Sequence, residues 1–308
     1  MVLQTQNPAP VVVTNDEIDL IAVFQIIWRG KWQVLSITFL AAIIAVVYAI
    51  MQPNIYQSKA LLAPAANNSQ PQASQFQGLA AMAGINVGGA GIDKIDIALE
   101  TLKSHRFILN FIANREILVP LMAIKSWDKE TNTIIYDDAI YDKKLNKWTS
   151  KNGTKPSYAR VYDKFKSVLN IAKDPITNFV TLSIDFPVPA LAQKWVSWLV
   201  SDINQYSRDK EIKNSKNSIE YLQNQLGNTH IADIRLVFFE LIKKETQNML
   251  LAATREEYIF ETIDPSILPE KRTSPKRALI AILGTLLGGL LGLIFVFGRH
   301  IYAGINKE

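Results

Sequence analysis

The segment "SPKRALIAILGTLLGGLLGLIFVFGRH", residues 274–300, decides the fold of this chain. Its uncharged core of about twenty residues is long enough to cross the hydrocarbon layer of a bilayer as a helix. Glycine recurs at every fourth position, which places these glycines on one helix face and lets a second helix approach closely. The sequence therefore predicts packing either against the first apolar helix or against another subunit, through Gly284, Gly288, Gly289 and Gly292.

A second apolar run, "WQVLSITFLAAIIAVVYAIM", extends from Trp32 to Met51 and contains no charged residue. About thirty residues precede it, so a retained anchor is favoured over a cleaved signal peptide. Basic residues before the first helix and after the second predict cytoplasmic termini by the positive-inside rule. The basic cluster at 271–277 opposes this orientation, but it ends a long segment, and long segments translocate largely regardless of charge.

The expected organisation has five parts: a cytoplasmic tail with an amphipathic segment, two transmembrane helices around a domain on the opposite side of the membrane, and a second cytoplasmic tail. Their boundaries are 1–31, 32–51, 52–277, 278–297 and 298–308. In the first part, Thr14 and Glu17 have the spacing of a helix capping box. The protein is thus expected in a membrane, with both termini on the cytoplasmic side.

The central segment predicts an α+β domain with a membrane-proximal sheet and long helices that extend from it. Alternating apolar residues predict strands at 55–62, 168–174, 178–186 and 256–263, the first pairing with the last. Helices are expected at 92–114 and 158–169, whereas 65–91 is predicted to be a mobile loop and 117–157 an irregular polar stretch. From 189 to about 255 the pattern predicts a two-helix arm, interrupted at Gly227-Asn228, which packs on copies of itself.

Composition and motifs argue against an enzyme. The 308 residues include no cysteine, so disulfides, thiol nucleophiles and Cys-ligated metals are excluded. The three histidines are far apart, and the chain has neither a phosphate loop nor a nucleophile elbow. Asp137, Asp138 and Asp142 lack the EF-hand pattern and are expected in a solvated loop. We expect no catalytic residue, cofactor or metal, and the net charge of +5, clustered beside a membrane helix, indicates lipid headgroups rather than nucleic acid.

Three stretches together resemble the Wzz chain-length determinant family, the polysaccharide co-polymerases of Gram-negative inner membranes. They are "NDEIDLIAVFQIIWRGKW", "YQSKALLAP" and "DPSILPEKRTSPKRALIAILGTLLGGLLG", with Asp19-Leu20, the run Trp28–Trp32, and the proline segment marked by Pro265, Pro269 and Pro275. The resemblance covers about 45 residues at each end, and the chain is similar to the kinase-free type of the family.

The resemblance implies a periplasmic α/β base with a long helical arm, assembled as a homo-oligomeric ring. It also implies a non-catalytic role in setting the modal length of a lipid-linked polysaccharide, such as O-antigen, made by a membrane polymerase. The proline segment either sets the angle between sheet and membrane helix or is a simple rigid linker. Two other functions stay open at this stage: a polysaccharide export adaptor and a two-helix membrane sensor.

Overall fold

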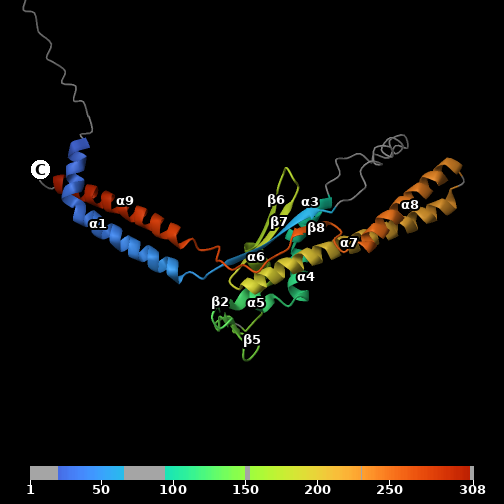
Figure 1. Ribbon diagram of the computed structural model, residues 1–308, viewed down its shortest axis with the longest axis horizontal. Helices are drawn as coiled ribbons and strands as arrows, with labels where there is room; N and C mark the ends of the chain where they lie inside the picture. Colours follow the sequence, from blue (N-terminus) through green and yellow to red (C-terminus); the bar gives the residue numbers. More distant parts are fainter. Residues whose placement is uncertain (1–19, 66–93, 150–152, 230, 306–308) are drawn as a thin grey trace, which may run out of the picture. The chain divides into compact units, whose positions relative to one another are not determined.

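The computed structural model describes residues 20–65, 94–149, 153–229 and 231–305, and it divides into two units. Unit 1 contains two helices, α1 (Leu20–Met51) and α9 (Arg277–Ile305), and unit 2 extends from Pro53 to Pro275. The predicted α+β class, with apolar helices bracketing a mixed domain, is confirmed (Figure 1). The capping box at Thr14 and Glu17 and almost all of the predicted loop at 65–91 lie outside the described residues.

Both helices of unit 1 are long and apolar enough to cross a membrane. The qualifying segments are Trp28–Met51 and Arg277–Arg299, each with a mean hydropathy of 2.6. Helix α1 begins at Leu20, before the predicted first span, and α9 continues to Ile305, beyond the predicted second span. The two helices pack along each other.

A four-stranded antiparallel sheet with the order β6-β7-β1-β8 organises unit 2. Its strands are β1 (Tyr56–Pro64), β6 (Leu169–Lys173), β7 (Val180–Phe186) and β8 (Phe260–Asp264). The predicted pairing of the first strand with the last is confirmed by the register, in which Leu62 lies opposite Thr262. Ile55 also forms an isolated bridge with Ser274, so the first and last residues of unit 2 are adjacent.

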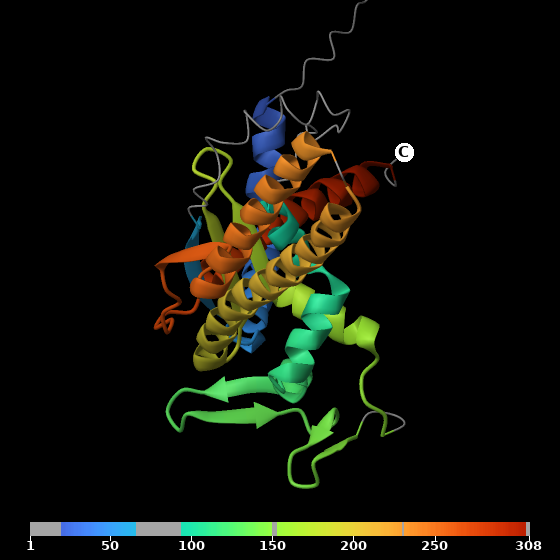
Figure 2. The same ribbon diagram turned by 90° about the vertical axis from the view of Figure 1, so that its right-hand side faces the viewer.

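The core of unit 2 lies between the sheet and the helices that cover it. Helix α7 (Pro189–Asn228) packs on β1 and β7 through its first four turns. The indole of Trp195 is fully buried, and its ring centroid lies 4.4 Å from that of Phe186. Helix α6 (Tyr158–Val168) adds Phe165, which is also fully buried. Beyond this base, α7 pairs with α8 (Ala232–Thr254) as the expected two-helix arm (Figures 1 and 2).

Two predictions for the region before α6 were wrong. The helix expected at 92–114 is two helices, α3 (Lys94–Lys103) and α4 (His105–Asn114). Ser104 separates them because its hydroxyl accepts a hydrogen bond from the Phe107 backbone N–H, at 3.2 Å, and so caps α4. The stretch expected to be irregular contains a short helix, α5 (Leu118–Ala123), and two hairpins. Their strands are β2 (Ile124–Asp128), β3 (Thr133–Tyr136), β4 (Tyr141–Asp142) and β5 (Lys147–Trp148).

Asn204 fixes α7 to the edge strand β8. Its side-chain carbonyl accepts hydrogen bonds from the backbone N–H groups of Ile259 and Phe260, at 2.9 and 3.0 Å. Its amide donates to the Phe260 carbonyl at 3.0 Å, and the side chain is buried. Three hydrogen bonds from one buried amide thus connect the root of the arm to the sheet.

Replacement of Asn204 by Leu is expected to destabilise unit 2 by about 3 kcal/mol, because it leaves buried backbone groups unpaired. Urea denaturation of the full chain in detergent, followed by tryptophan fluorescence, measures the change. Asn217→Ala, at an exposed position further along α7, is the control and is expected to change the free energy of unfolding by less than about 0.5 kcal/mol. A loss of equal size in both variants would contradict this role for Asn204.

Candidate functional sites

The four glycines predicted to mediate packing lie on α9, and three of them face α1 of the same chain. A Cβ atom added to Gly284 would overlap the Ala45 Cβ, and one added to Gly288 would overlap the Ala41 Cβ. At Gly292 it would lie 3.1 Å from the Val34 Cα. Gly289 differs, since its nearest neighbour would be the Thr38 Oγ1, at 3.7 Å, which is ordinary van der Waals contact.

Helix α1 supplies a complementary surface of small residues that was not identified from the sequence. Gly30 faces Val296 closely enough that a Cβ would lie 2.5 Å from the Val296 Cγ1, and Ala49 is buried. The contacting positions on α1 rise as those on α9 fall, which shows that the helices are antiparallel. The contacting positions on α1 are spaced three or four residues apart, namely Gly30, Val34, Thr38, Ala41 and Ala45. This spacing was the available signal in the sequence. It is hard to recognise because most of the residues between these positions are also apolar.

The proline segment lies against the sheet and α7 of unit 2. The Ser58 hydroxyl of β1 donates to the Ile267 carbonyl at 2.9 Å, and the Ser266 hydroxyl is 2.7 Å from that of Ser197. Of the three prolines, Pro275 is buried, Pro269 is half-buried and Pro265 is exposed. The bond between Ser274 and Pro275 is cis.

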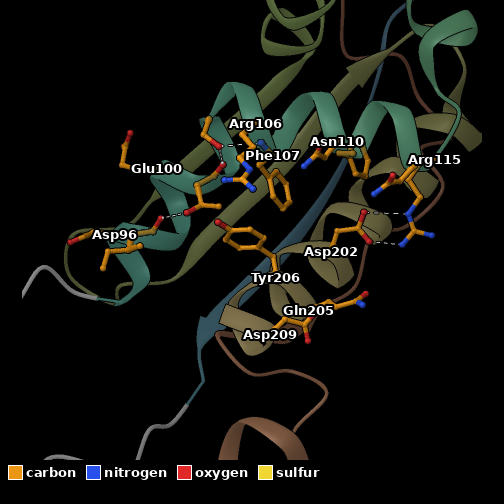
Figure 3. A pocket seen from close by; sticks show the side chains of 15 residues that line it. Asp96, Glu100, Arg106, Phe107, Asn110, Arg115, Asp202, Gln205, Tyr206 and Asp209 are labelled. Atoms are coloured by element: carbon orange, nitrogen blue, oxygen red, sulfur yellow. Dashed lines mark hydrogen bonds and ion pairs between the residues drawn. The ribbon is translucent and has the colours of Figure 1, made fainter. Parts of the chain in front are cut away.

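A separate cleft of about 880 Å³ lies between α7 and the pair α3–α4 (Figure 3). Helix α4 turns its apolar face to the core through Phe107, Ile108, Phe111 and Ile112. Its polar residues are therefore left on the outer side, where three of them line the cleft at four-residue intervals: Arg106, Asn110 and Asn114. Together they span about 12 Å of the helix.

The opposite wall comes from the middle of α7, which contributes Asp202, Gln205, Tyr206 and Asp209. Tyr206 is 40% exposed, and its ring meets that of Phe107 edge-on, with the centroids 5.9 Å apart. Figure 3 shows this aromatic pair between the two walls, with Asp96 and Glu100 of α3 towards one end. The cleft thus combines an accessible aromatic ring with many polar side chains.

Ion pairs hold the ends of the cleft. The Arg115 guanidinium donates from Nε to the Asp202 Oδ2 at 3.2 Å and makes a second, shorter bond to Oδ1. It also lies over the Trp198 ring, 5.1 Å from the centroid. The hydrogen bonds that Arg115 donates to Asp202 raise the pKa of the guanidinium. At the other end, Lys173 Nζ is 2.6 Å from the Asp96 Oδ1.

A further ion pair connects the start of α3 to α7. Lys94 Nζ is 2.9 Å from the Glu211 Oε1 and 3.4 Å from the Tyr258 hydroxyl. Burial acts to lower the pKa of Lys94, but the hydrogen bond and the charge of Glu211 outweigh it, so the pKa is raised above 10.5. For the Tyr258 phenol, burial acts in the opposite direction and raises the pKa.

The remaining residues considered as possible ligands occupy ordinary structural positions. His105 stacks on Tyr162 with the ring centroids 3.6 Å apart. The carboxylates of Asp137 and Asp142 accept hydrogen bonds from backbone N–H groups in tight turns. Within the described part of the chain, no group of three or more His, Cys, Asp or Glu residues could hold a metal ion. His230 and the side chain of His300 lie outside the description.

Comparison with known proteins gives one consistent family. The model of the family "Wzz: Chain length determinant protein" matches residues 16–114. A curated "Chain length determinant protein" from Escherichia coli is 22% identical over 327 residues, which cover 95% of each chain. The predicted resemblance to the Wzz chain-length determinant family is confirmed by these two matches.

Solved structures with similarity to the chain include a "full-length bacterial polysaccharide co-polymerase", at 17% identity and a TM-score of 0.39. That match covers 95% of this chain and 100% of the other. A "Fragment of WzzB, Polysaccharide Co-polymerase from Salmonella Typhimurium" is 11% identical with a TM-score of 0.29, covering 71% and 99%.

The glycine face of α9, formed by Gly284, Gly288 and Gly292, predicts different outcomes for two neighbouring substitutions on this helix. Gly288→Ala places a methyl group against Ala41 and is expected to lower the stability of the α1–α9 pair by about 1–3 kcal/mol. Gly289→Ala, with only ordinary contact to Thr38, is expected to be neutral. Thermal unfolding of the two full-length variants in the same detergent provides the comparison. Equal melting temperatures would show that α1 does not pack on α9 through Gly288.

The Lys94–Glu211 pair predicts a dependence of stability on pH. A raised lysine pKa in the folded state contributes stability that is complete below the unfolded pKa of 10.5 and is lost as the pH rises through the folded pKa. The melting temperature of Lys94→Met is therefore expected to lie below that of the wild type at pH 8 and to approach it above pH ~11. A difference that stays constant over this range would contradict the assignment.

Proposed function

We propose that this chain is a non-catalytic regulator of polysaccharide chain length, which sets the modal length of an O-antigen made by a membrane polymerase. The observation that carries the proposal is the match to the Wzz chain-length determinant family at residues 16–114, together with a curated relative aligned over 95% of both chains. The two apolar helices that bracket an α+β unit agree with the layout expected of a membrane-anchored regulator.

The proposed location is a bacterial inner membrane, with α1 and α9 as the spans and with cytoplasmic termini. Residues 52–277 then form the periplasmic domain. Arg29 and Lys31 precede the first apolar core, and Arg299 follows the second. This distribution supports the orientation through the positive-inside rule.

The proposed working form is a homo-oligomeric ring that contacts the polymerase and its lipid-linked polysaccharide. Self-association is supported by the arm, where α8 leaves several large apolar side chains exposed. Among them are Leu236, Val237, Phe239 and Leu250, which are 51–65% exposed. Large apolar surfaces of this kind mark interaction sites. The glycine face is proposed to hold the two spans of each subunit together inside this assembly.

Length regulation is tested by the surface polysaccharide of cells with and without the gene. Deletion is expected to convert a clustered ladder on a silver-stained gel into a broad spread while polymer continues to be made. Complementation with the intact chain should restore the clustering. Complete loss of polymer would indicate an export adaptor instead, and an unchanged ladder would indicate a sensor or another role.

A further inference from the structure

We propose that the cleft between α4 and α7 binds a short segment of a neutral, hydroxyl-rich polysaccharide. This inference rests on the proposed function, because it names the polymer as the ligand of a specific surface. It goes beyond that function by assigning the contact to the base of the domain rather than to the membrane helices or the arm.

The first argument is that exposed side chains with free hydrogen-bonding groups line the cleft. Within the residues that the structure describes, the side-chain amides of Asn110, Asn114 and Gln205 make no hydrogen bond with protein. Nor do the Arg106 guanidinium and the Tyr206 hydroxyl. An amide offers two donors and two acceptor sites, whereas a hydroxyl is both donor and acceptor. Sugar hydroxyls complement such a surface, because each can donate to one side chain and accept from another.

The second argument concerns charge. Four carboxylates and two guanidinium groups line the cleft. Three of the carboxylates have cationic partners, since Asp202 pairs with Arg115, Asp96 with Lys173 and Glu100 with Lys103. The fourth, Asp209, lies 3.9 Å from the guanidinium of Arg208. Among the described lining residues, only the Arg106 guanidinium then carries a charge without an ion-pair partner. A single exposed cation is too little to favour an acidic polymer or a phosphate over a neutral ligand.

The third argument is shape. The polar stripe on α4 and the facing stripe on α7 each run for about two turns and form two walls of one cleft (Figure 3). Tyr206 presents an accessible ring between them, and such a ring can pack against the apolar face of a pyranose. The volume of about 880 Å³ is within the range of ligand sites and admits a short oligosaccharide.

The test measures binding of delipidated surface polysaccharide, purified from cells that carry this gene, to the full-length protein in nanodiscs. Isothermal titration calorimetry is run on the wild type and on the double variant Asn110→Ala/Tyr206→Ala. The matched control is Asn217→Ala/Tyr221→Ala, which changes the same residue types at exposed positions of α7 outside the cleft. We expect the cleft variant to bind at least about tenfold more weakly and the control to bind like the wild type. Circular dichroism checks that both variants are folded.

Several outcomes would overturn the proposal. One is the absence of binding to the wild-type protein, and another is equal weakening in both double variants. A third is equal binding of polygalacturonate, an acidic polymer, since this contradicts a neutral ligand. A fourth is a cleft variant that changes the number of subunits without affecting polysaccharide binding, which would make the cleft a contact between copies. Failure of the proposed function is separate, because it appears as an unchanged ladder in the deletion strain even when binding is measured.

Discussion

The antiparallel pairing of β1 with β8 is the constraint on which the rest of the structure depends. Strand β1 follows the first apolar helix directly, and β8 shortly precedes the second, so their pairing closes unit 2 on itself. The backbone N–H of Ile55 donates to the Ser274 carbonyl at 2.9 Å, and that of Thr273 donates to the Ile55 carbonyl at 2.8 Å. The chain therefore enters and leaves unit 2 at adjacent points. In unit 1, the close approach of Gly284 to Ala45 brings the corresponding ends of α1 and α9 together independently.

One helix connects the base of unit 2 to its arm. In its first turns α7 is a core helix, with Trp195 and Leu199 fully buried against the sheet. Further along, its contacts change to α8, where the buried Ser215 hydroxyl donates to the Glu245 carboxylate at 2.8 Å. Asn204 lies between these regions and bonds to the backbone of β8. Because one continuous helix contacts both the sheet and α8, the direction of the arm is determined by how α7 packs on the sheet.

The elements that the sequence predicted well are those with a strong local pattern. The apolar runs, the alternation at 55–62 and the amphipathic stretch at 158–169 each specify one type of structure. The first strand and the last were predicted to pair because both adjoin membrane helices. The glycines at 284, 288 and 292 were found from their spacing, but their partners on α1 are alanines, a threonine and a valine. Such residues are common in any apolar helix and carry no local signal.

The elements that were missed are those that hydrophobic periodicity does not specify. The break at Ser104 is an N-cap inside an otherwise continuous apolar pattern, so periodicity alone predicted one helix. The hairpins between Ile124 and Trp148 are short and polar, and they are stabilised by side-chain contacts such as Tyr141 against Trp148, at 5.1 Å between ring centroids. The cleft was also missed, because it forms only when two distant helices pack together. Its walls are separated by about 90 residues of sequence, and each wall by itself is only the solvent-facing stripe of an amphipathic helix.

The position of the cleft follows from the same packing that forms the core. Helix α4 buries Phe107 and Phe111, and α7 buries Leu199 and Ile203, so their polar stripes meet along one edge of the core. Asp202 and Tyr206 of the cleft are each two residues from Asn204, which holds the arm's root to β8. Contacts made in the cleft therefore act on the turns of α7 that carry the connection between sheet and arm. For the proposed function, this provides the physical connection between the surface proposed to contact polymer and the element that extends from the base.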